Sequence, residues 1–151
     1  MQTGAKDKTP VLGMLERNNK VEGRVLHETA NGKSIKPILF DKIKKSATVI
    51  TDGFGAYHNI DQNFKRHIII NHHQDEYVVG DFHTNTIEGF WSLLKRGIIG
   101  IYHFTSDKHL QKYVDEFTFR YNSRHVSTAT RFNAMLSDTE HRLTYKDLIS
   151  E

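Results

Sequence analysis

Cysteine is absent from this chain of 151 residues, and proline occurs only twice. The lack of cysteine excludes a disulfide framework, a thiol nucleophile and any zinc site built on thiolates. No apolar run approaches the roughly 18 residues of a membrane-spanning helix, and the opening MQTGAKDKTP has no apolar signal core. We therefore expect a cytoplasmic location and no membrane partner.

Charge of either sign is also modest. The 21 Lys and Arg residues against 18 Asp and Glu leave a formal net charge of +3, which is weak support for a polyanionic partner. Ten histidines include the pair His72-His73, but no helical H-x-x-x-H pattern occurs, so we expect surface or partly buried histidines rather than zinc ligands. The length suits a single domain covering 1–151.

The first half of the chain predicts a hairpin, then a helix, then two more strands. Asn18-Asn19 separates the first two apolar runs, and asparagine tolerates the positive φ of a tight hairpin turn. Apolar residues recur at helical spacing in NGKSIKPILFDKIKKSA, with Pro37 expected in the first turn. This order predicts an α/β fold with a mixed sheet and flanking helices. The expected strands lie within 10–17, 20–27, 47–51 and 67–70.

The second half predicts two helices after a loop at 74–82. The second of these helices, roughly 106–122, has Ser106 as its expected N-cap. The stretch 130–149 is a weaker pattern with one short helical turn. An apolar stripe on the first helix comprises Ile87, Phe90, Trp91, Leu94 and Ile98.

Glu88, within HTNTIEGFWSLLKRG, allows two interpretations. If Asn85 is the N-cap of the helix, Glu88 is its third residue and the reciprocal partner in a capping box. Lys95 is then a solvated residue, and Trp91 an ordinary core aromatic. In the other interpretation, Glu88 belongs to a catalytic site.

Asp52 gives weight to the catalytic interpretation. It follows a β-branched run and precedes Gly53-Phe54-Gly55, and strand ends in α/β sheets can present carboxylates to a ligand. The 35 residues of the segment 53–87 suffice to bring the helix start back beside the strand end. Two such carboxylates could hold Mg²⁺, which prefers oxygen ligands. Lys95 lies two turns beyond Glu88 on the same helix face, about 10 Å along the axis, where a cation could contact a DNA phosphate.

The stretches ITDGFGAY, HTNTIEGFWSLLKRGIIGIYH, HLQKYVDEFTFRYNSR and KTPVLGMLER resemble the ISXO-like transposases of bacterial insertion sequences. The resemblance covers about residues 8–138, and its motif N-T-x-x-E-G-F-W-S-x-x-K-R is specific. It implies the DDE superfamily and an RNase H-like catalytic domain. The implied activity is metal-dependent strand cleavage and strand transfer at the ends of the element, with two Mg²⁺ (or Mn²⁺) ions and DNA as the partner.

The resemblance also implies roles for individual residues. Asp52 matches the second catalytic aspartate, Glu88 the third acidic position, and Lys95 the lysine that follows it. Asn85 either contributes to the metal site or only caps the helix. We expect Lys95, Arg96 and Arg124 to contact DNA.

The first aspartate of the family lies on a strand before the K-T-P-V-L-G run, and only Asp7 is acidic in the segment that precedes Lys8 here. Asp7 does not end an apolar strand, so we leave it unassigned and expect a domain that lacks its first strand and has no separate DNA-binding domain. An inactive fragment that binds DNA or a full-length transposase is therefore the alternative function. A plain α/β domain without a functional site is the third alternative. The sequence leaves open whether the chain forms a homo-oligomer.

Overall fold

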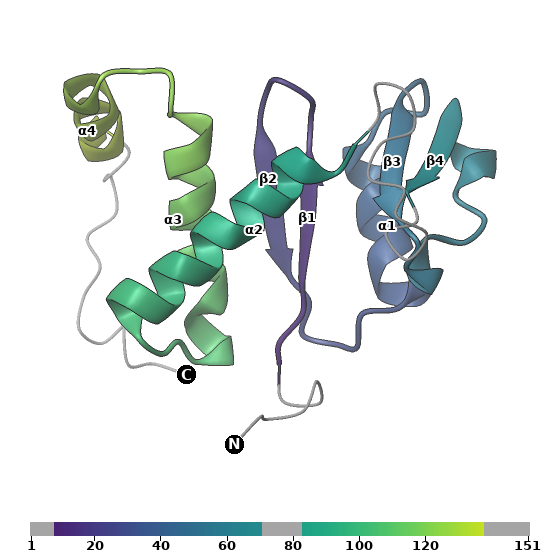
Figure 1. Cartoon of the computed structure of the whole chain (residues 1–151), viewed down its shortest axis with the longest axis horizontal. Coiled ribbons are helices and arrows are strands. Elements are labelled where there is room, and N and C mark those ends of the chain that lie inside the picture. The colour runs from purple at the N-terminus through teal and green to yellow at the C-terminus, as the bar shows by residue number, and fades with distance from the viewer. Residues whose placement is uncertain (1–7, 71–82, 138–151) are drawn as a thin grey trace.

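The computed structural model describes residues 8–70 and 83–137 (Figure 1). Helices and short strands alternate in it, so the expected α/β class is confirmed. The predicted loop at 74–82 lies outside the described residues. None of the described helices is long and apolar enough to cross a membrane.

The predicted hairpin forms, with β1 (Val11–Leu15) and β2 (Val21–Val25) antiparallel. Asn18 has a φ of 60°, the left-handed conformation that asparagine tolerates better than most residues. In the register, Val11 lies opposite Val25 and Leu15 opposite Val21. These four residues lie on one face of the hairpin, and Leu12 and Met14 lie on the other, so each face packs against different helices.

Helix α1 (Gly32–Lys42) begins earlier than expected. Its N-cap is Asn31, whose side chain accepts hydrogen bonds from the backbone N–H groups of Lys33 and Ser34, and the Ser34 hydroxyl accepts in return from the Asn31 N–H. This capping box fixes the helix start five residues before Pro37, so the prediction that Pro37 lies in the first turn is wrong. Ile35 and Leu39 are buried as the periodicity predicted.

After α1 the chain forms β3 (Thr48–Asp52) and β4 (Arg66–Ile70), which pair in parallel with Asp52 opposite Ile70. The short helical turns η2 (Gly55–Tyr57) and η3 (Asp61–Asn63) connect them. Within the described residues the strands form two separate two-stranded sheets, β1-β2 and β3-β4, rather than one continuous mixed sheet.

Helix α2 (Asn85–Gly97) continues into a π-helical turn, η5 (Ile98–Tyr102), and α3 (Asp107–Asn122) runs back beside the hairpin (Figure 1). Ser106 is the N-cap of α3 as predicted, although its side chain makes no capping hydrogen bond. The last described helix, α4 (Thr128–Ser137), is longer than the short turn expected there and has no buried residue.

Two hydrophobic clusters share the hairpin between them. One face of the hairpin packs with α1 and β3, and the opposite face packs with α2 and α3. The first cluster is Leu12, Leu26, Ile35, Leu39, Val49, Ala56, Ile60 and Phe64. The second is Val21, Val25, Phe90, Leu94, Val114 and Phe117, and the predicted stripe residues Ile87, Trp91 and Ile98 pack against it. The amphipathic stripe of α2 is therefore confirmed, with Trp91 half-buried rather than fully buried.

Candidate active site

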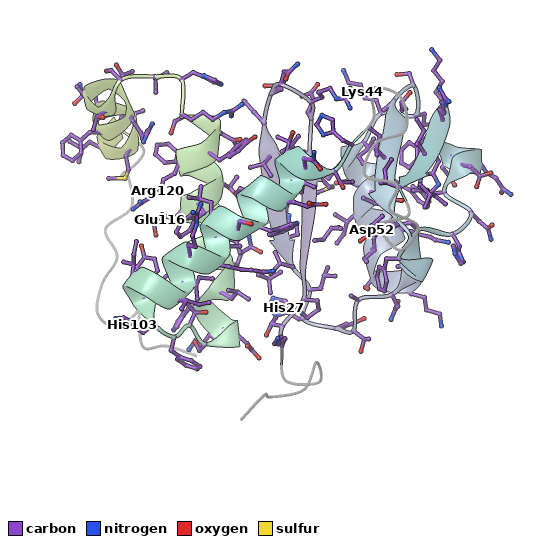
Figure 2. All side chains as sticks on the ribbon, in the orientation of Figure 1. His27, Lys44, Asp52, His103, Glu116 and Arg120 are labelled. Atoms are coloured by element: carbon purple, nitrogen blue, oxygen red, sulfur yellow. The ribbon has the colours of Figure 1, made fainter. Side chains whose placement is uncertain are left out.

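Asp52 is the last residue of β3, and its side chain is exposed at the strand end (Figure 2). One carboxylate oxygen, Oδ1, accepts a hydrogen bond from the backbone N–H of Phe54 at 3.1 Å. This bond closes the Gly53-Phe54-Gly55 turn and holds the carboxylate at the end of the strand. Burial, and secondarily the negative charge of Asp52, raises the pKa of Tyr57 to about 12. The negative charge of Asp52 therefore influences Tyr57 in η2, the first helical turn after β3.

Glu88 lies in the first turn of α2, but not in a capping box. The N-cap is Thr84, so Asn85 is the first helical residue, and the interpretation of Asn85 as the cap is wrong. The Thr84 hydroxyl donates a hydrogen bond to Glu88 Oε1 at 2.8 Å. This bond orients one oxygen of a carboxylate whose side chain is otherwise solvent-accessible. Its position near the helix N-terminus also suits a negative charge.

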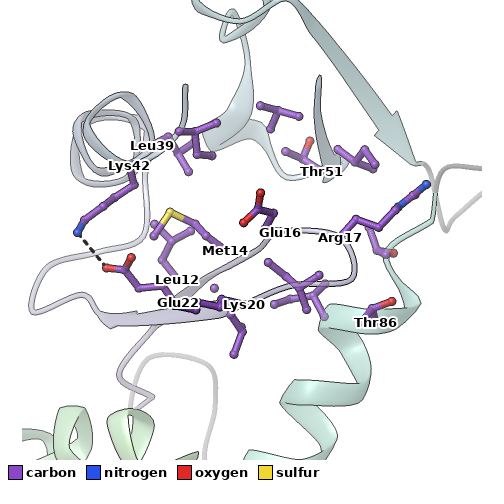
Figure 3. Close-up of a pocket in the computed structure, with 18 of the residues that line it drawn as sticks. Leu12, Met14, Glu16, Arg17, Lys20, Glu22, Leu39, Lys42, Thr51 and Thr86 are labelled. Atoms are coloured by element: carbon purple, nitrogen blue, oxygen red, sulfur yellow. Dashed lines mark ion pairs between the residues drawn. The ribbon is translucent and has the colours of Figure 1, made fainter. Parts of the chain in front are cut away.

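Asp52 and Glu88 both line one cavity of about 1070 Å³. The cavity lies between β1 and β3, with α1 along one side and the start of α2 along the other (Figure 3). A strand end and a helix start with 35 residues between them in the sequence thus line the same cavity. Each contributes a carboxylate to the wall of the same cavity.

The other predicted site residues lie outside the set that lines this cavity. Asn85, Lys95 and Arg96 are exposed on α2. Arg124 follows α3, where its guanidinium lies 4.2 Å from the centre of the Tyr121 ring and donates to the Tyr121 carbonyl at 2.9 Å. Asp52 and Glu88 therefore line one cavity, and the predicted DNA contacts lie outside its lining.

The cavity also contains residues that the sequence did not single out. Glu16, at the end of β1, points into it (Figure 3) and accepts a hydrogen bond from the Asn19 side-chain amide at 2.6 Å. Lys42 of α1 pairs with Glu22 of β2 at 3.3 Å across its rim. His83 lines it too, and its Nδ1 is buried with no hydrogen-bond partner among the described residues. A charged residue beside a turn is ordinarily solvated, so the sequence holds no signal for Glu16.

The cavity wall contains carboxylate oxygens, the type of ligand atom that hard divalent cations bind. Carboxylate oxygens are the ligands that Mg²⁺ and Mn²⁺ prefer, and Mg²⁺ is commonly held by one or two carboxylates together with substrate phosphates. Asp52 and Glu88 supply these two. Within residues 8–70 and 83–137, no group of three His, Cys, Asp or Glu side chains is close enough to hold a metal ion by itself.

Comparison with known proteins adds a decisive observation. Residues 1–122 match the family described as the ISXO2-like transposase domain, which is more than half of the chain. The chain belongs to this family. A protein in the transposable element ISH50 of Halobacterium salinarum is 38% identical to this transposase domain over 96 residues. No solved structure matches the domain.

The halobacterial relative is much longer than the segment it shares. The alignment covers 62% of the present chain and 32% of the relative, so the shared segment is about a third of that protein. Family membership confirms the resemblance inferred from N-T-x-x-E-G-F-W-S-x-x-K-R.

Proposed function

We propose that this transposase domain carries out metal-dependent phosphoryl transfer on DNA, with strand cleavage followed by strand transfer at the ends of an insertion sequence. The observation that carries the proposal is that Asp52 and Glu88 line one cavity, in a chain of a transposase family. We also propose that the hairpin, α1 and the parallel pair β3-β4 are parts of an RNase H-like core.

In this mechanism Asp52 and Glu88 hold Mg²⁺ or Mn²⁺ together with the phosphate oxygens of the DNA. Bound there, such ions would supply the positive charge that activates a water or a 3′-hydroxyl and stabilises the leaving oxygen of an in-line displacement. The Phe54 N–H and the Thr84 hydroxyl each donate to one oxygen of these carboxylates and so orient them. Asn85, one turn before Glu88, is an additional candidate ligand.

The cationic surface beside the cavity would position the DNA. Lys95 and Arg96 are exposed in the last turns of α2, and phosphate contacts from such side chains do not depend on base sequence. Arg124 already contacts Tyr121, so it would bind a phosphate with its side chain partly preorganised. Binding through these residues should weaken steeply with salt, because it releases counterions from the DNA.

The test is a cleavage and strand-transfer assay with Mg²⁺ or Mn²⁺ on DNA that carries the ends of the element. Asp52→Asn and Glu88→Gln should each abolish the reaction, because they remove charge with little change of shape. Asp41→Asn and Glu28→Gln change exposed carboxylates outside the cavity and should leave it intact. Equal activity in all four variants would overturn the assignment of the site.

A second readout does not depend on turnover. Mn²⁺ is paramagnetic and broadens the NMR signals of nearby amides, so the Gly53 and Gly89 signals should broaden first as Mn²⁺ is added. Asp52→Asn combined with Glu88→Gln should remove this selectivity. Uniform broadening across the surface of the unsubstituted domain would contradict a metal site at the cavity.

The alternative function is that of a non-catalytic fragment that binds DNA or a longer transposase. It is favoured by the lack of a group of three metal-binding side chains within the described residues. The two functions give different results in the same experiment. A fragment of this kind would show salt-sensitive DNA binding that Lys95→Ala and Arg96→Ala weaken, without metal-dependent cleavage.

A further inference from the structure

Phe54 is an aromatic residue whose backbone is fixed beside the Asp52 carboxylate. Its N–H donates to Asp52 Oδ1 at 3.1 Å, and its C=O accepts from the Tyr57 N–H at 3.1 Å. Both polar groups of its backbone are therefore bonded within the turn that follows β3. A phenylalanine ring lies one side-chain length from the N–H of its own residue. The ring of Phe54 consequently lies close to the carboxylate.

The ring of Phe54 is exposed and at the same time oriented. The residue is 45% exposed, and its ring meets that of Tyr57 edge to face, with centroids 6.0 Å apart and planes at 81°. Tyr57 in turn packs against the hydrophobic cluster around α1. Aromatic pairs of this geometry attract each other beyond the area that they bury. Phe54 therefore presents apolar surface to solvent in a defined orientation.

Phe40 is a second exposed ring, and it shows that exposure alone has no meaning. It is 41% exposed on α1 and tilts against Phe64, with ring centroids 5.8 Å apart. Phe64 precedes β4, so this pair lies near the start of the β3-β4 sheet, about 13 Å from its Asp52 end. Single exposed apolar side chains are common on proteins. The position beside Asp52 is what distinguishes Phe54.

Gly55, the next residue, is a glycine that the surrounding structure does not require. Its φ lies outside the left-handed region. Among the described residues, a Cβ at this position would meet only Cε1 of His58, at the ordinary contact distance of 3.9 Å. A further use of glycine is to let a ligand approach the backbone closely. Gly55 therefore supports a ligand that approaches this turn.

The chemistry of the Phe54 ring selects the kind of ligand. A phenylalanine face recognises a partner by stacking, and the flat groups of DNA are its bases. Within a nucleotide, the base lies one sugar away from its own phosphate. A phosphate held at Asp52 through a cation would bring a base of the same strand within reach of Phe54. A base in a duplex is covered by the neighbouring pairs, so it must leave the stack to contact the ring.

We propose that Phe54 binds a nucleobase: a base next to the phosphate at Asp52 stacks, unpaired, on the Phe54 ring. Phe54 thereby positions the strand at the reacting phosphate, and the domain favours DNA that is unpaired at this point. Stacking accepts every base, so the contact adds affinity and orientation without sequence preference. The inference rests on the proposed function for the presence of a phosphate at Asp52.

The experiment compares the binding of two single strands to the whole chain in Mg²⁺. One is a thymidine strand of about 12 nucleotides, and the other is an abasic strand of the same length and charge. Phe54→Leu should bind the thymidine strand about tenfold more weakly than the wild type, and Phe54→Tyr, which keeps the ring, within about twofold. All three proteins should bind the abasic strand equally. Phe40→Leu is the matched control and should change neither affinity.

The abasic strand separates a contact to a base from a structural role of the ring. An equal loss on both strands in Phe54→Leu would overturn the proposal, as would unchanged affinity for the thymidine strand. Pairing this strand with an adenosine strand should remove the difference between the wild type and Phe54→Leu, because a paired base cannot reach the ring. A difference that persists in the duplex would overturn the requirement for an unpaired base.

Tryptophan fluorescence reports the stacking directly. Trp91 is the only Trp of the chain, so Phe54→Trp in the Trp91→Phe background places a single indole at the proposed site. A nucleobase stacked on an indole quenches its fluorescence. The thymidine strand should therefore quench this variant and the abasic strand should not, while Phe40→Trp in the same background should respond to neither. Quenching at both positions alike, or at neither, would overturn the proposal.

Failure of this inference and failure of the proposed function give different results. If Asp52→Asn abolishes metal-dependent cleavage and Phe54→Leu binds and cleaves as the wild type does, the proposed function stands and the nucleobase site falls. If no protein cleaves DNA with Mg²⁺ or Mn²⁺, but the thymidine strand alone quenches Phe54→Trp, the nucleobase site stands and the proposed function falls.

Discussion

The side-chain amide of Asn122 bonds to both the N–H and the C=O of Val21, although 101 positions separate the two residues in the sequence. It thereby closes the outer edge of β2 as another strand would, and links the end of α3 to the start of β2. Such closure also guards against edge-to-edge aggregation.

Replacing Asn122 with Ala should lower the free energy of unfolding by about 1–3 kcal/mol, because two partly buried backbone groups lose their partner. Asn122→Asp keeps the acceptor for the Val21 N–H and loses the donor for its C=O, so it should cost less than Ala. Urea unfolding followed by circular dichroism measures both. A free energy unchanged in Asn122→Ala would show that water replaces the amide without loss.

Two glycines of α2 should respond in opposite ways to alanine. A Cβ at Gly97 would overlap the ring of Phe117, so Gly97→Ala should destabilise the domain by about 1–3 kcal/mol. A Cβ at Gly89 has nothing within 4 Å, and Gly89→Ala should stabilise the helix by about 0.5–1 kcal/mol. Thermal unfolding of the two variants side by side gives the comparison. Equal shifts of Tm would show that Phe117 does not pack against Gly97.

Tyr57 should lose its proton only at strongly alkaline pH. Burial, and secondarily the charge of Asp52, raises its pKa to about 12, from about 10 in the unfolded chain. The neutral phenol is thus favoured in the folded state, and its contribution is fully present below about pH 10 and lost as the pH rises toward 12. The tyrosinate absorbance of the wild type minus that of Tyr57→Phe isolates this titration. In Asp52→Asn the pKa should fall but stay above 10, because burial is the larger cause.

His67 should make folding sensitive to acid. Its Nε2 lies 2.8 Å from the hydroxyl of Thr51, and burial lowers its pKa, although the charge of Asp61 opposes this in part. The neutral ring is favoured in the folded state, so its contribution is present above about pH 6.5 and lost as the pH falls through the lower folded-state value. Unfolding free energies measured between neutral and mildly acid pH should therefore fall less in His67→Gln than in the wild type. An identical pH profile in the two proteins would contradict this role.

Local patterns predicted the elements that depend on local chemistry. Asn18 in a hairpin turn, the apolar stripe of α2 and the strand that ends at Asp52 were all predictable from spacing and residue type. The local predictions that were wrong concern the residues at which helices begin. Asn31 with Ser34 forms the capping box of α1 in place of the start expected near Pro37, and Thr84 takes the N-cap position assigned to Asn85.

Contacts between distant segments were less accessible to sequence reasoning. The spacing of Asp52 and Glu88 suggested a common site, and both residues line one cavity. The entry of Glu16 into the cavity depends on the relative placement of β1 and β3, which no local pattern specifies. The closure of β2 by Gln111 and Asn122 depends likewise on the packing of α3, so both residues look like ordinary polar positions of a helix.

The two clusters that share the hairpin have a consequence for cooperativity. Asp52 belongs to the half that packs around α1, and Glu88 to the half that packs around α2, so the two carboxylates are held by separately packed bodies. We expect each body to open with its own free energy, as foldons do. A ligand that contacts both carboxylates should join the two bodies into one unit. Occupancy of the cavity should therefore be visible as the merging of two unfolding transitions into one.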